Sequence, residues 1–247
     1  MTISKLKYIG AYFSPLLAIL SFNLSGYWAF IGVATLYILV PILEQFLPKD
    51  TYNLTKSEKQ LAKKDKFYDW ILYLLAPVQL YVVYVFLTTI SRPDILFIEL
   101  LGYSLMMGTI LGVNGINGGH ELGHKTDHPI KIFLAHVLLM TSLQNHFMTY
   151  HNSGHHKDVA TPNDLTTAKK GQSFYSFAFQ SQIGGYFKTW KLENEKLKKR
   201  GKNPLLNPMI LTTLVPWLFQ GLIFFNFGYF VGSMYFLASV FGILILE

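Results

Sequence analysis

Long apolar stretches, separated by shorter polar and basic segments, dominate the pattern of this chain. A helix needs roughly 20 apolar residues to cross about 30 Å of hydrocarbon, and six stretches approach or reach that length. They run approximately from 8 to 23, 26 to 46, 70 to 90, 95 to 117, 205 to 227 and 228 to 246. The pattern therefore predicts an all-α polytopic membrane protein, a single integral-membrane domain over residues 1–247.

The long segment between the fourth and fifth predicted spans, residues 120–204, has a different character. Its first part, 130–143, is moderately apolar and predicts a helix, whereas 152–171 is polar and predicts a loop. Residues 186–200 are amphipathic and basic, and they predict a further helix. We expect this whole segment to lie on the cytoplasmic side of the membrane.

Composition and charge are consistent with a membrane protein that has one basic side. Hydrophobic residues make up 51% of the chain and charged residues only 14%, which is unusual for a water-soluble fold. The formal charge is +7, and every Lys and Arg except Arg92 falls in the N-terminus, in 49–66 or in 120–202. Six spans place these three segments on one side, which the positive-inside rule identifies as the cytoplasm. We therefore expect both termini in the cytoplasm and no nucleic-acid partner.

The absence of cysteine limits the metal chemistry that the chain can support. Without thiolates, disulfides, zinc–thiolate sites and iron–sulfur clusters are excluded, so histidine or carboxylate side chains must hold any metal. All eight histidines fall between residues 120 and 156, directly after the fourth predicted span. His128, His136 and His146 are isolated, and we expect ordinary surface or core roles for them.

Two groups of closely spaced histidines predict a metal site. His120 and His124 are four residues apart, so on a helix their Cβ atoms lie about 5–6 Å apart on one face. His151 and His155 repeat that spacing, and His156 adds an adjacent ring. Five imidazoles suit iron, copper, nickel or zinc, and they exceed the three or four ligands that one zinc ion takes. We therefore predict two metal ions and expect the two groups to converge in the fold.

Two other interpretations of the same residues remain open. His120-Glu121-Leu122-Gly123-His124 also fits the H-E-x-x-H pattern, in which two histidines bind zinc and the glutamate is the general base of a metalloprotease. That interpretation leaves the second histidine group unexplained, and the chain has no Asp-Gly pair of the kind that marks a common intramembrane version. A membrane protein that binds metal without catalysing a reaction is the second alternative.

Around these histidines the sequence resembles the membrane-bound alkane 1-monooxygenases, relatives of the fatty-acid desaturases and hydroxylases whose histidine boxes hold two irons. The resemblance extends over nearly the whole chain. Its segments are Pro41–Glu44, Asn117–Lys125, His146-Phe147, His151–Asp164, Gly171–Ser173 and Trp190–Glu193. By resemblance, the iron ligands are His120, His124, His151, His155 and His156.

The resemblance implies a non-haem di-iron enzyme that hydroxylates the terminal carbon of alkanes with dioxygen, in the inner membrane of a bacterium. A desaturase or hydroxylase acting on the acyl chains of lipids is the nearest alternative. No flavin or nucleotide fingerprint appears, and the resemblance implies electrons from a rubredoxin and its NAD(P)H-dependent reductase. An acidic partner of this kind fits a basic helix, although positive-inside loops produce the same pattern. The candidate residues are Lys188, Lys191, Lys196, Lys198, Lys199 and Arg200.

Three carboxylates, Glu121, Asp158 and Asp164, are candidates to accept the free N–H groups of metal-bound imidazoles and so to orient the rings. The chain also departs from the resembled family at two places. The family commonly has glutamate directly before the second histidine group, where this chain has Tyr150. The family's further histidine motifs follow its sixth span, where this sequence reaches Glu247. We therefore expect the chain to lack the family's C-terminal region, to bind iron weakly and not to hydroxylate alkanes.

Overall fold

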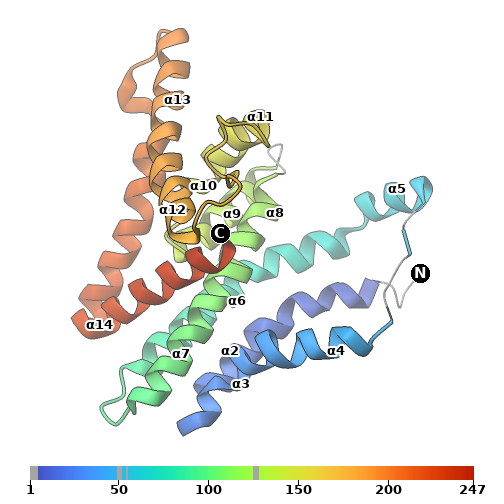
Figure 1. Cartoon of the computed structure of the whole chain (residues 1–247), viewed down its shortest axis with the longest axis vertical. Helices are drawn as coiled ribbons and strands as arrows, with labels where there is room; N and C mark the ends of the chain where they lie inside the picture. Colours follow the sequence, from blue (N-terminus) through green and yellow to red (C-terminus); the bar gives the residue numbers. More distant parts are fainter. Residues whose placement is uncertain (1–4, 49–51, 54, 125–127) are drawn as a thin grey trace.

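The computed structural model describes residues 5–48, 52–53, 55–124 and 128–247, and within them it contains helices and no strand. In Figure 1 the long apolar helices lie in the lower part of the view, and shorter helices lie above them. The predicted fold class, an all-α polytopic membrane protein, is confirmed. Lys49 and Lys125 were both part of the predicted basic side, and Lys125 was also part of the resemblance. Both residues lie outside the described residues.

Within the part of the chain that the structure describes, four continuous helical runs are long and apolar enough to cross a membrane. The first joins η2 (Gly26–Phe30), α3 (Ile31–Ala34), η3 (Thr35–Leu39) and α4 (Val40–Phe46); the others are α6 (Lys66–Ile90), α7 with its continuation, and α14 (Pro208–Leu246). The predicted first span forms a shorter apolar helix, η1 (Lys7–Tyr12) followed by α2 (Phe13–Phe22).

The third run continues beyond its predicted end at residue 117. Helix α7 (Phe97–Ile110) passes through a π-helical stretch, η4 (Leu111–Asn117), into α8 (Gly118–Gly123) without a break. His120 therefore lies on the last turns of a spanning helix and not on a loop after it. Such π-helical insertions within α-helices often occur at functional sites.

The last run contains both of the final predicted spans. The 39 residues of α14 are helical on either side of Gly228, whose φ of 81° lies in the left-handed region. Glycine adopts that conformation without the steric cost that a Cβ imposes. The chain therefore folds back at this residue, and the two arms of α14 form the hairpin that is drawn in orange to red in Figure 1.

Close backbone approach joins the membrane helices that carry the site. A Cβ at Gly112 in η4 would lie 2.8 Å from the carbonyl oxygen of Gly242 in α14, and one at Gly242 would lie 2.5 Å from the carbonyl oxygen of Gly108. Small residues at such crossings let two backbones touch, which favours helix association in lipid. Buried side chains including Phe86, Tyr103 and Tyr235 fill the adjacent core.

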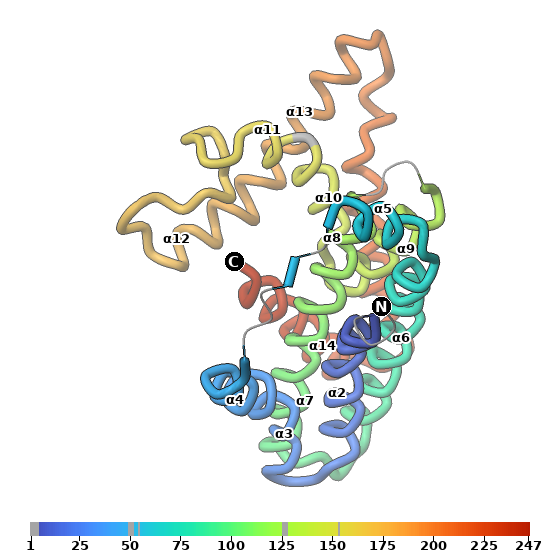
Figure 2. The backbone as a smooth tube through the Cα atoms, turned by 90° about the vertical axis from the view of Figure 1, so that its right-hand side faces the viewer, coloured from blue at the N-terminus to red at the C-terminus, as the bar shows by residue number. Residues whose placement is uncertain are grey.

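The segment after α8 forms a second layer at one end of the bundle. It contains α9 (Pro129–Thr141), α10 (Phe147–Tyr150), η5 (His151–His155), α11 (His156–Asp158), α12 (Phe174–Phe179), η6 (Gln180–Gly184), α13 (Gly185–Lys199) and η7 (Pro204–Leu206). Figure 2 shows α5 (Lys56–Lys64) and α13, the two basic helices, at this same end, whereas the turn between α6 and α7 lies at the other.

A buried ion pair fastens α9 to the membrane bundle. The Nζ atom of Lys131 lies 2.7 Å from Oδ1 of Asp69 in α6, and Lys131 is only 4% exposed. Breaking such a pair leaves a buried charge without compensation, so it holds the position of α9 against α6. Helix α9 in turn supports α8, which carries the first histidine group.

Candidate metal centre

Three imidazoles from two distant parts of the chain converge. The Nε2 atom of His120 lies 2.7 Å from that of His124 and 2.8 Å from that of His151, and the third Nε2 pair, His124 and His151, is 3.3 Å apart. His120 belongs to α8 and His151 to η5, which are joined through α9 and α10. The fold thus brings the two predicted groups to one point.

The spacing of these nitrogens fits a common metal ion. Two nitrogens that each lie roughly 2.1 Å from one ion, at tetrahedral or octahedral angles, are about 2.9–3.4 Å apart. Of the three observed separations, 3.3 Å falls within this range, and 2.7 and 2.8 Å fall just below it. Neutral imidazoles are also the preferred form for binding iron, copper, nickel or zinc.

His151 is held in the neutral form that a metal ligand requires. Burial, together with the smaller effect of the neighbouring His120 and His156 rings, lowers the pKa of His151 to about 3. The ring stacks on Phe147, with centroids 5.1 Å apart and planes inclined by 22°. An uncharged ring between an aromatic side chain and other imidazoles keeps its lone pair available for a metal.

His155 and His156 lie beside the three converging rings. The ring of His155 stacks on His151 at 5.3 Å, and the ring of His156 lies 4.4 Å from His151 and 5.2 Å from His124, all measured between centroids. All five predicted ligands therefore form one continuous group of rings. The structure brings His120, His124 and His151 closest to a common point.

The other three histidines lie outside this group of rings. His128 precedes α9 as its N-cap residue, and Nδ1 of His136 faces Oδ1 of Asn145 at 3.4 Å. His146 is half-buried against Tyr186, and burial lowers its pKa to about 4. Its side chain lines the cavity beside the converging rings.

Glycine residues allow α8 to present its histidines at this place. A Cβ at Gly119 would lie 2.7 Å from Cγ of Leu139 and 3.2 Å from the carbonyl oxygen of Ala135, both in α9. A Cβ at Gly123 would collide with the side chain of Met148. The glycine face of α8 therefore packs tightly on α9 and α10, and the histidines, one position further along the helix, face the second group.

The three predicted carboxylates occupy different environments. Oδ2 of Asp164 lies 3.0 Å from Nδ1 of His155, and Asp164 is only 2% exposed. Asp158 instead pairs with Lys188 of α13, with Oδ2 and Nζ 2.9 Å apart. Glu121 is largely exposed, and its Oε1 lies 3.9 Å from Nδ1 of His120, beyond hydrogen-bond distance.

Asp164 remains ionised although it is buried. Burial alone raises the pKa of its carboxyl group, but hydrogen bonds from Thr167, Thr166 and His155 outweigh that effect and hold the pKa well below its usual range. The contacts of these threonines with Asp164 were not predicted, nor was that of Tyr150, whose hydroxyl lies 3.2 Å from Oδ1 of Asp164. The Asp-Leu-Thr-Thr sequence at 164–167 was the available signal, since hydroxyl groups shortly after an aspartate commonly bond to it.

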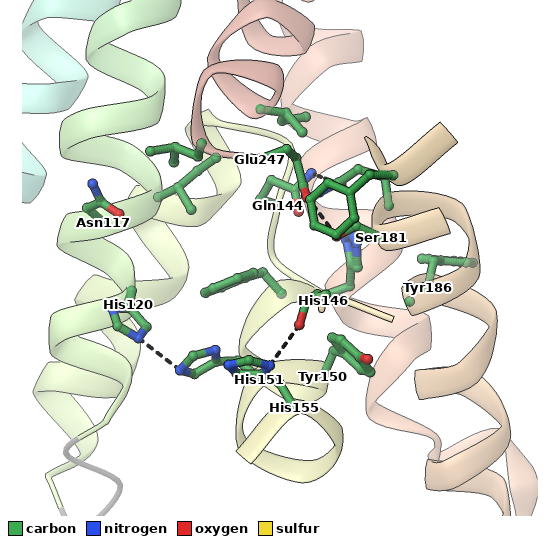
Figure 3. A pocket seen from close by; sticks show the side chains of 18 residues that line it. Asn117, His120, Gln144, His146, Tyr150, His151, His155, Ser181, Tyr186 and Glu247 are labelled. Carbon is green, nitrogen blue, oxygen red and sulfur yellow. Dashed lines mark hydrogen bonds between the residues drawn. The ribbon is translucent and has the colours of Figure 1, made fainter. Parts of the chain in front are cut away.

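A cavity of about 340 Å³ adjoins the histidines, as Figure 3 shows. His120, His151 and His155 lie on one part of its wall, and Ser181 and Glu247 lie on another. Its apolar lining comes from η4, α10, α12 and α14, through Ile116, Phe147, Phe177, Ile243 and Leu246. This cavity was not predicted from the sequence, because its walls come from elements far apart in the chain.

Comparisons with known proteins connect this site to a family. Residues 96–246 match the family described as fatty acid desaturase. The chain is 31% identical over 210 residues to alkane 1-monooxygenase 1 of Alcanivorax borkumensis and 30% identical over 210 residues to the alkane 1-monooxygenase of Ectopseudomonas oleovorans. Each alignment covers 82% of this chain and 52% of the relative.

A third relative has a different named substrate. The xylene/toluene monooxygenase hydroxylase component XylM of Pseudomonas putida is 29% identical over 189 residues, covering 75% of this chain and 49% of that protein. The chain spans about half the length of the curated relatives it matches. The matched region includes both histidine groups and the cavity-lining part of α14.

Proposed function

The chain belongs to the fatty acid desaturase family, and we propose that it is a membrane-bound monooxygenase that hydroxylates the terminal carbon of an alkane with dioxygen. The observation that carries this proposal is the contact between the histidine group and an apolar cavity. Metal-assisted oxidation needs the metal and the hydrocarbon to meet in a site that excludes water. The names of the most similar relatives favour alkane as the substrate.

We assign the metal ligands by their positions. His120, His124 and His151 are suited to one ion, and the neighbouring rings of His155 and His156 are suited to a second. Two non-haem irons account for five imidazoles better than one zinc ion does. When bound, iron supplies the oxidising power that protein side chains lack, because an unactivated C–H bond offers no acidic proton and no electrophilic carbon.

The side chains of the cavity bind and orient the hydrocarbon. Ile116, Phe147 and Ile243 offer apolar surface beside His120 and His151, so transfer of an alkane from lipid leaves it in an apolar environment. Phe147 also stacks on His151 and thus connects the substrate wall to the ligand group. Selection among alkanes then depends on the shape and length of the cavity and not on polar contacts.

Electrons come from a separate protein in this account. A rubredoxin, reduced by an NAD(P)H-dependent reductase, is the donor that the resemblance implies, and α13 is its docking surface. Lys188 and Lys196 are already paired with Asp158 and Glu193. The remaining exposed basic side chains that can steer an acidic partner are Lys191, Lys198, Lys199 and Arg200. A bacterial inner membrane with this face in the cytoplasm is the corresponding location.

Oxidation of acyl chains is the second candidate function, and the family match specifically favours it. The two candidates predict different products. We expect the chain extended by the resembled family's C-terminal region, in iron-supplied membranes with rubredoxin, its reductase, NADH and ¹⁸O₂, to convert n-octane to 1-octanol that carries ¹⁸O. A new double bond or hydroxyl group in the lipid acyl chains, with octane unchanged, would contradict the alkane assignment and support the second candidate. Neither product from iron-loaded protein would contradict both.

A further inference from the structure

We propose that Tyr150 is a positioning residue for the metal centre: it holds Asp164, and Asp164 fixes the ring of His155 with Nε2 as the nitrogen that accepts metal. This inference rests on the proposed function, since it concerns a ligand of that site. It adds a role for Tyr150, which directly precedes His151 in the chain.

The contacts of His155 determine which of its nitrogens carries the proton. Nδ1 lies 3.0 Å from Oδ2 of Asp164 and 2.7 Å from Oγ1 of Thr166. The hydroxyl of Thr166 has one hydrogen, which its 2.8 Å contact directs to Oδ1 of Asp164. Nδ1–H is then the donor to both oxygens, and Nε2 keeps its lone pair. This is the tautomer that a metal ligand bonded through Nε2 requires.

Asp164 can perform this role only if its own position is fixed. Oδ1 accepts hydrogen bonds from the backbone nitrogen of Thr166 at 3.1 Å and from the hydroxyl of Tyr150 at 3.2 Å. Oδ2 accepts one from Oγ1 of Thr167 at 2.6 Å. A buried carboxylate loses much of its hydration, so each donor both stabilises the charge and restricts the carboxylate plane. Of these donors, Tyr150 alone lies outside the turn at 164–167.

Tyr150 joins that turn to the helix of the second histidine group. It directly precedes His151, and its hydroxyl accepts a hydrogen bond from the backbone nitrogen of Leu165 at 3.1 Å while donating to Asp164. Its ring occupies space that Gly154 leaves free, because a Cβ there would lie 2.6 Å from Cε2 of the tyrosine. The phenol is therefore held at both ends, and it fixes the distance between η5 and the carboxylate.

A neutral donor at position 150 suits an ionised aspartate. Glutamate in this place would put a second carboxylate beside Asp164, and like charges at such distance oppose ionisation of both. A phenol donates a hydrogen bond without adding charge. The tyrosine thus donates to Oδ1 of Asp164 without placing a second charge beside the contact between Asp164 and His155.

The chain provides a matched control within the same loop. Asp158 is also partly buried and charge-paired, yet its partner is Lys188 of α13 and not a histidine. Asp158→Asn therefore removes a comparable carboxylate without touching His155. Tyr150→Phe removes the hydroxyl alone, Asp164→Asn removes the charge, and Thr167→Val removes a different donor to Asp164.

The test uses the full chain, purified in lipid nanodiscs, with two measurements. In metal-free protein labelled with ¹⁵N-histidine, and with the His155 signals assigned from a His155→Gln spectrum, we expect a protonated Nδ1. In Tyr150→Phe, Thr167→Val and Asp164→Asn we expect a mixture of tautomers. In Co²⁺ titrations we expect roughly tenfold weaker binding for Asp164→Asn, a smaller loss for Tyr150→Phe and Thr167→Val, and no change for Asp158→Asn.

Two results would overturn the proposal. One is a His155 spectrum and Co²⁺ affinity in Tyr150→Phe that match the unsubstituted protein. The other is an equal loss in Asp158→Asn, which would indicate a general effect of the loop. If Tyr150→Phe does not fold, Thr167→Val provides the same two measurements after loss of a different donor to Asp164, and an unchanged spectrum and affinity in that variant would also overturn the proposal. Failure of the unsubstituted chain to bind Co²⁺ would contradict the proposed function, whereas the tautomer measurement would still decide the role of Tyr150.

Discussion

The Nε2 atoms of His120 and His151 lie 2.8 Å apart although 31 positions separate the two residues in the chain. No local interaction produces this contact. It depends on the packing of α8 against α9 and on the turn that leads through α10 into η5. The candidate metal centre therefore depends on the packing of the whole helical layer, and changes far from the imidazoles can disturb it.

The close packing of Gly119 gives a first prediction. In Gly119→Val the added side chain meets Leu139, so α8 must move away from α9, at a cost of about 1–3 kcal/mol. We expect lower thermal stability and several-fold weaker Co²⁺ binding, with partial recovery when Leu139→Ala is added. Gly221→Val is the control, because a Cβ at Gly221 meets no atom within 4 Å. Equal Co²⁺ affinity in Gly119→Val and the unsubstituted chain would contradict this account of the packing.

The orientation in the membrane gives a second prediction, for which a chain without cysteine is well suited. We expect Asp94→Cys, in the turn between α6 and α7, to react with a membrane-impermeant maleimide added outside intact cells. Lys64→Cys and Lys199→Cys, on the two basic helices, should react only after the membrane is opened. The reverse pattern would show that the histidine layer faces outward.

The cavity gives a third prediction about the substrate. Ile243→Ala enlarges the cavity beside the histidines by shortening a half-buried side chain of its wall, and such a change alters selection between substrates by about 1–3 kcal/mol. We expect the product mixture from alkanes of six to twelve carbons to shift toward the longer chains. Leu237→Ala, on the same helix but 56% exposed, is the control and should leave the mixture unchanged. An identical shift in both variants would show that this cavity does not determine which alkane is hydroxylated.

Burial of His146 and His151 gives a fourth prediction, on acid stability. Their pKa values are lowered to about 4 and about 3, so the unfolded chain takes up protons at these residues more readily than the folded chain. The stabilisation that comes from these two neutral rings is then fully present above about pH 6.5 and decreases as the pH falls toward 4. The loss is at most about 1.4 kcal/mol per pH unit for each residue, and it is smaller where solvent screens the ring.

Thermal melting of the metal-free chain between pH 7.5 and 5 measures this dependence. We expect a lower melting temperature at pH 5, and a weaker dependence on pH in His146→Phe, which removes one of the two groups. A melting temperature in His146→Phe that falls as steeply as in the unsubstituted chain would contradict a contribution from this residue.

The sequence predicted the helical class and the two histidine groups because both depend on short-range periodicity. The length of the apolar stretches identified the membrane helices, and the four-residue spacing of His120 and His124 indicated that both lie on one face of a helix. The fourth predicted span ended near residue 117, whereas the helical run continues to Gly123, and the absence of a side chain at Gly119 lets this continuation pack closely on α9.

Other features could not be predicted from the sequence because they depend on tertiary contacts. Asp158 and Asp164 are equivalent candidates by position in the sequence, yet one meets Lys188 and the other meets His155. Which contact forms depends on how α13 packs beside η5. In the same way, the cavity has no sequence signal, because Ile116 and Ile243 come together only when α14 folds back at Gly228.

Iron content tests the central claim, that two distant histidine groups form one metal centre, most directly. Chains expressed with ⁵⁷Fe and purified under reducing conditions would be compared as the unsubstituted protein, His120→Ala, His151→Ala and His128→Ala. We predict the same weakly bound iron in the unsubstituted chain and in His128→Ala, and its loss in both His120→Ala and His151→Ala, because each removes a ligand from the same site. Iron retained at the same level in His120→Ala or His151→Ala would contradict the shared centre.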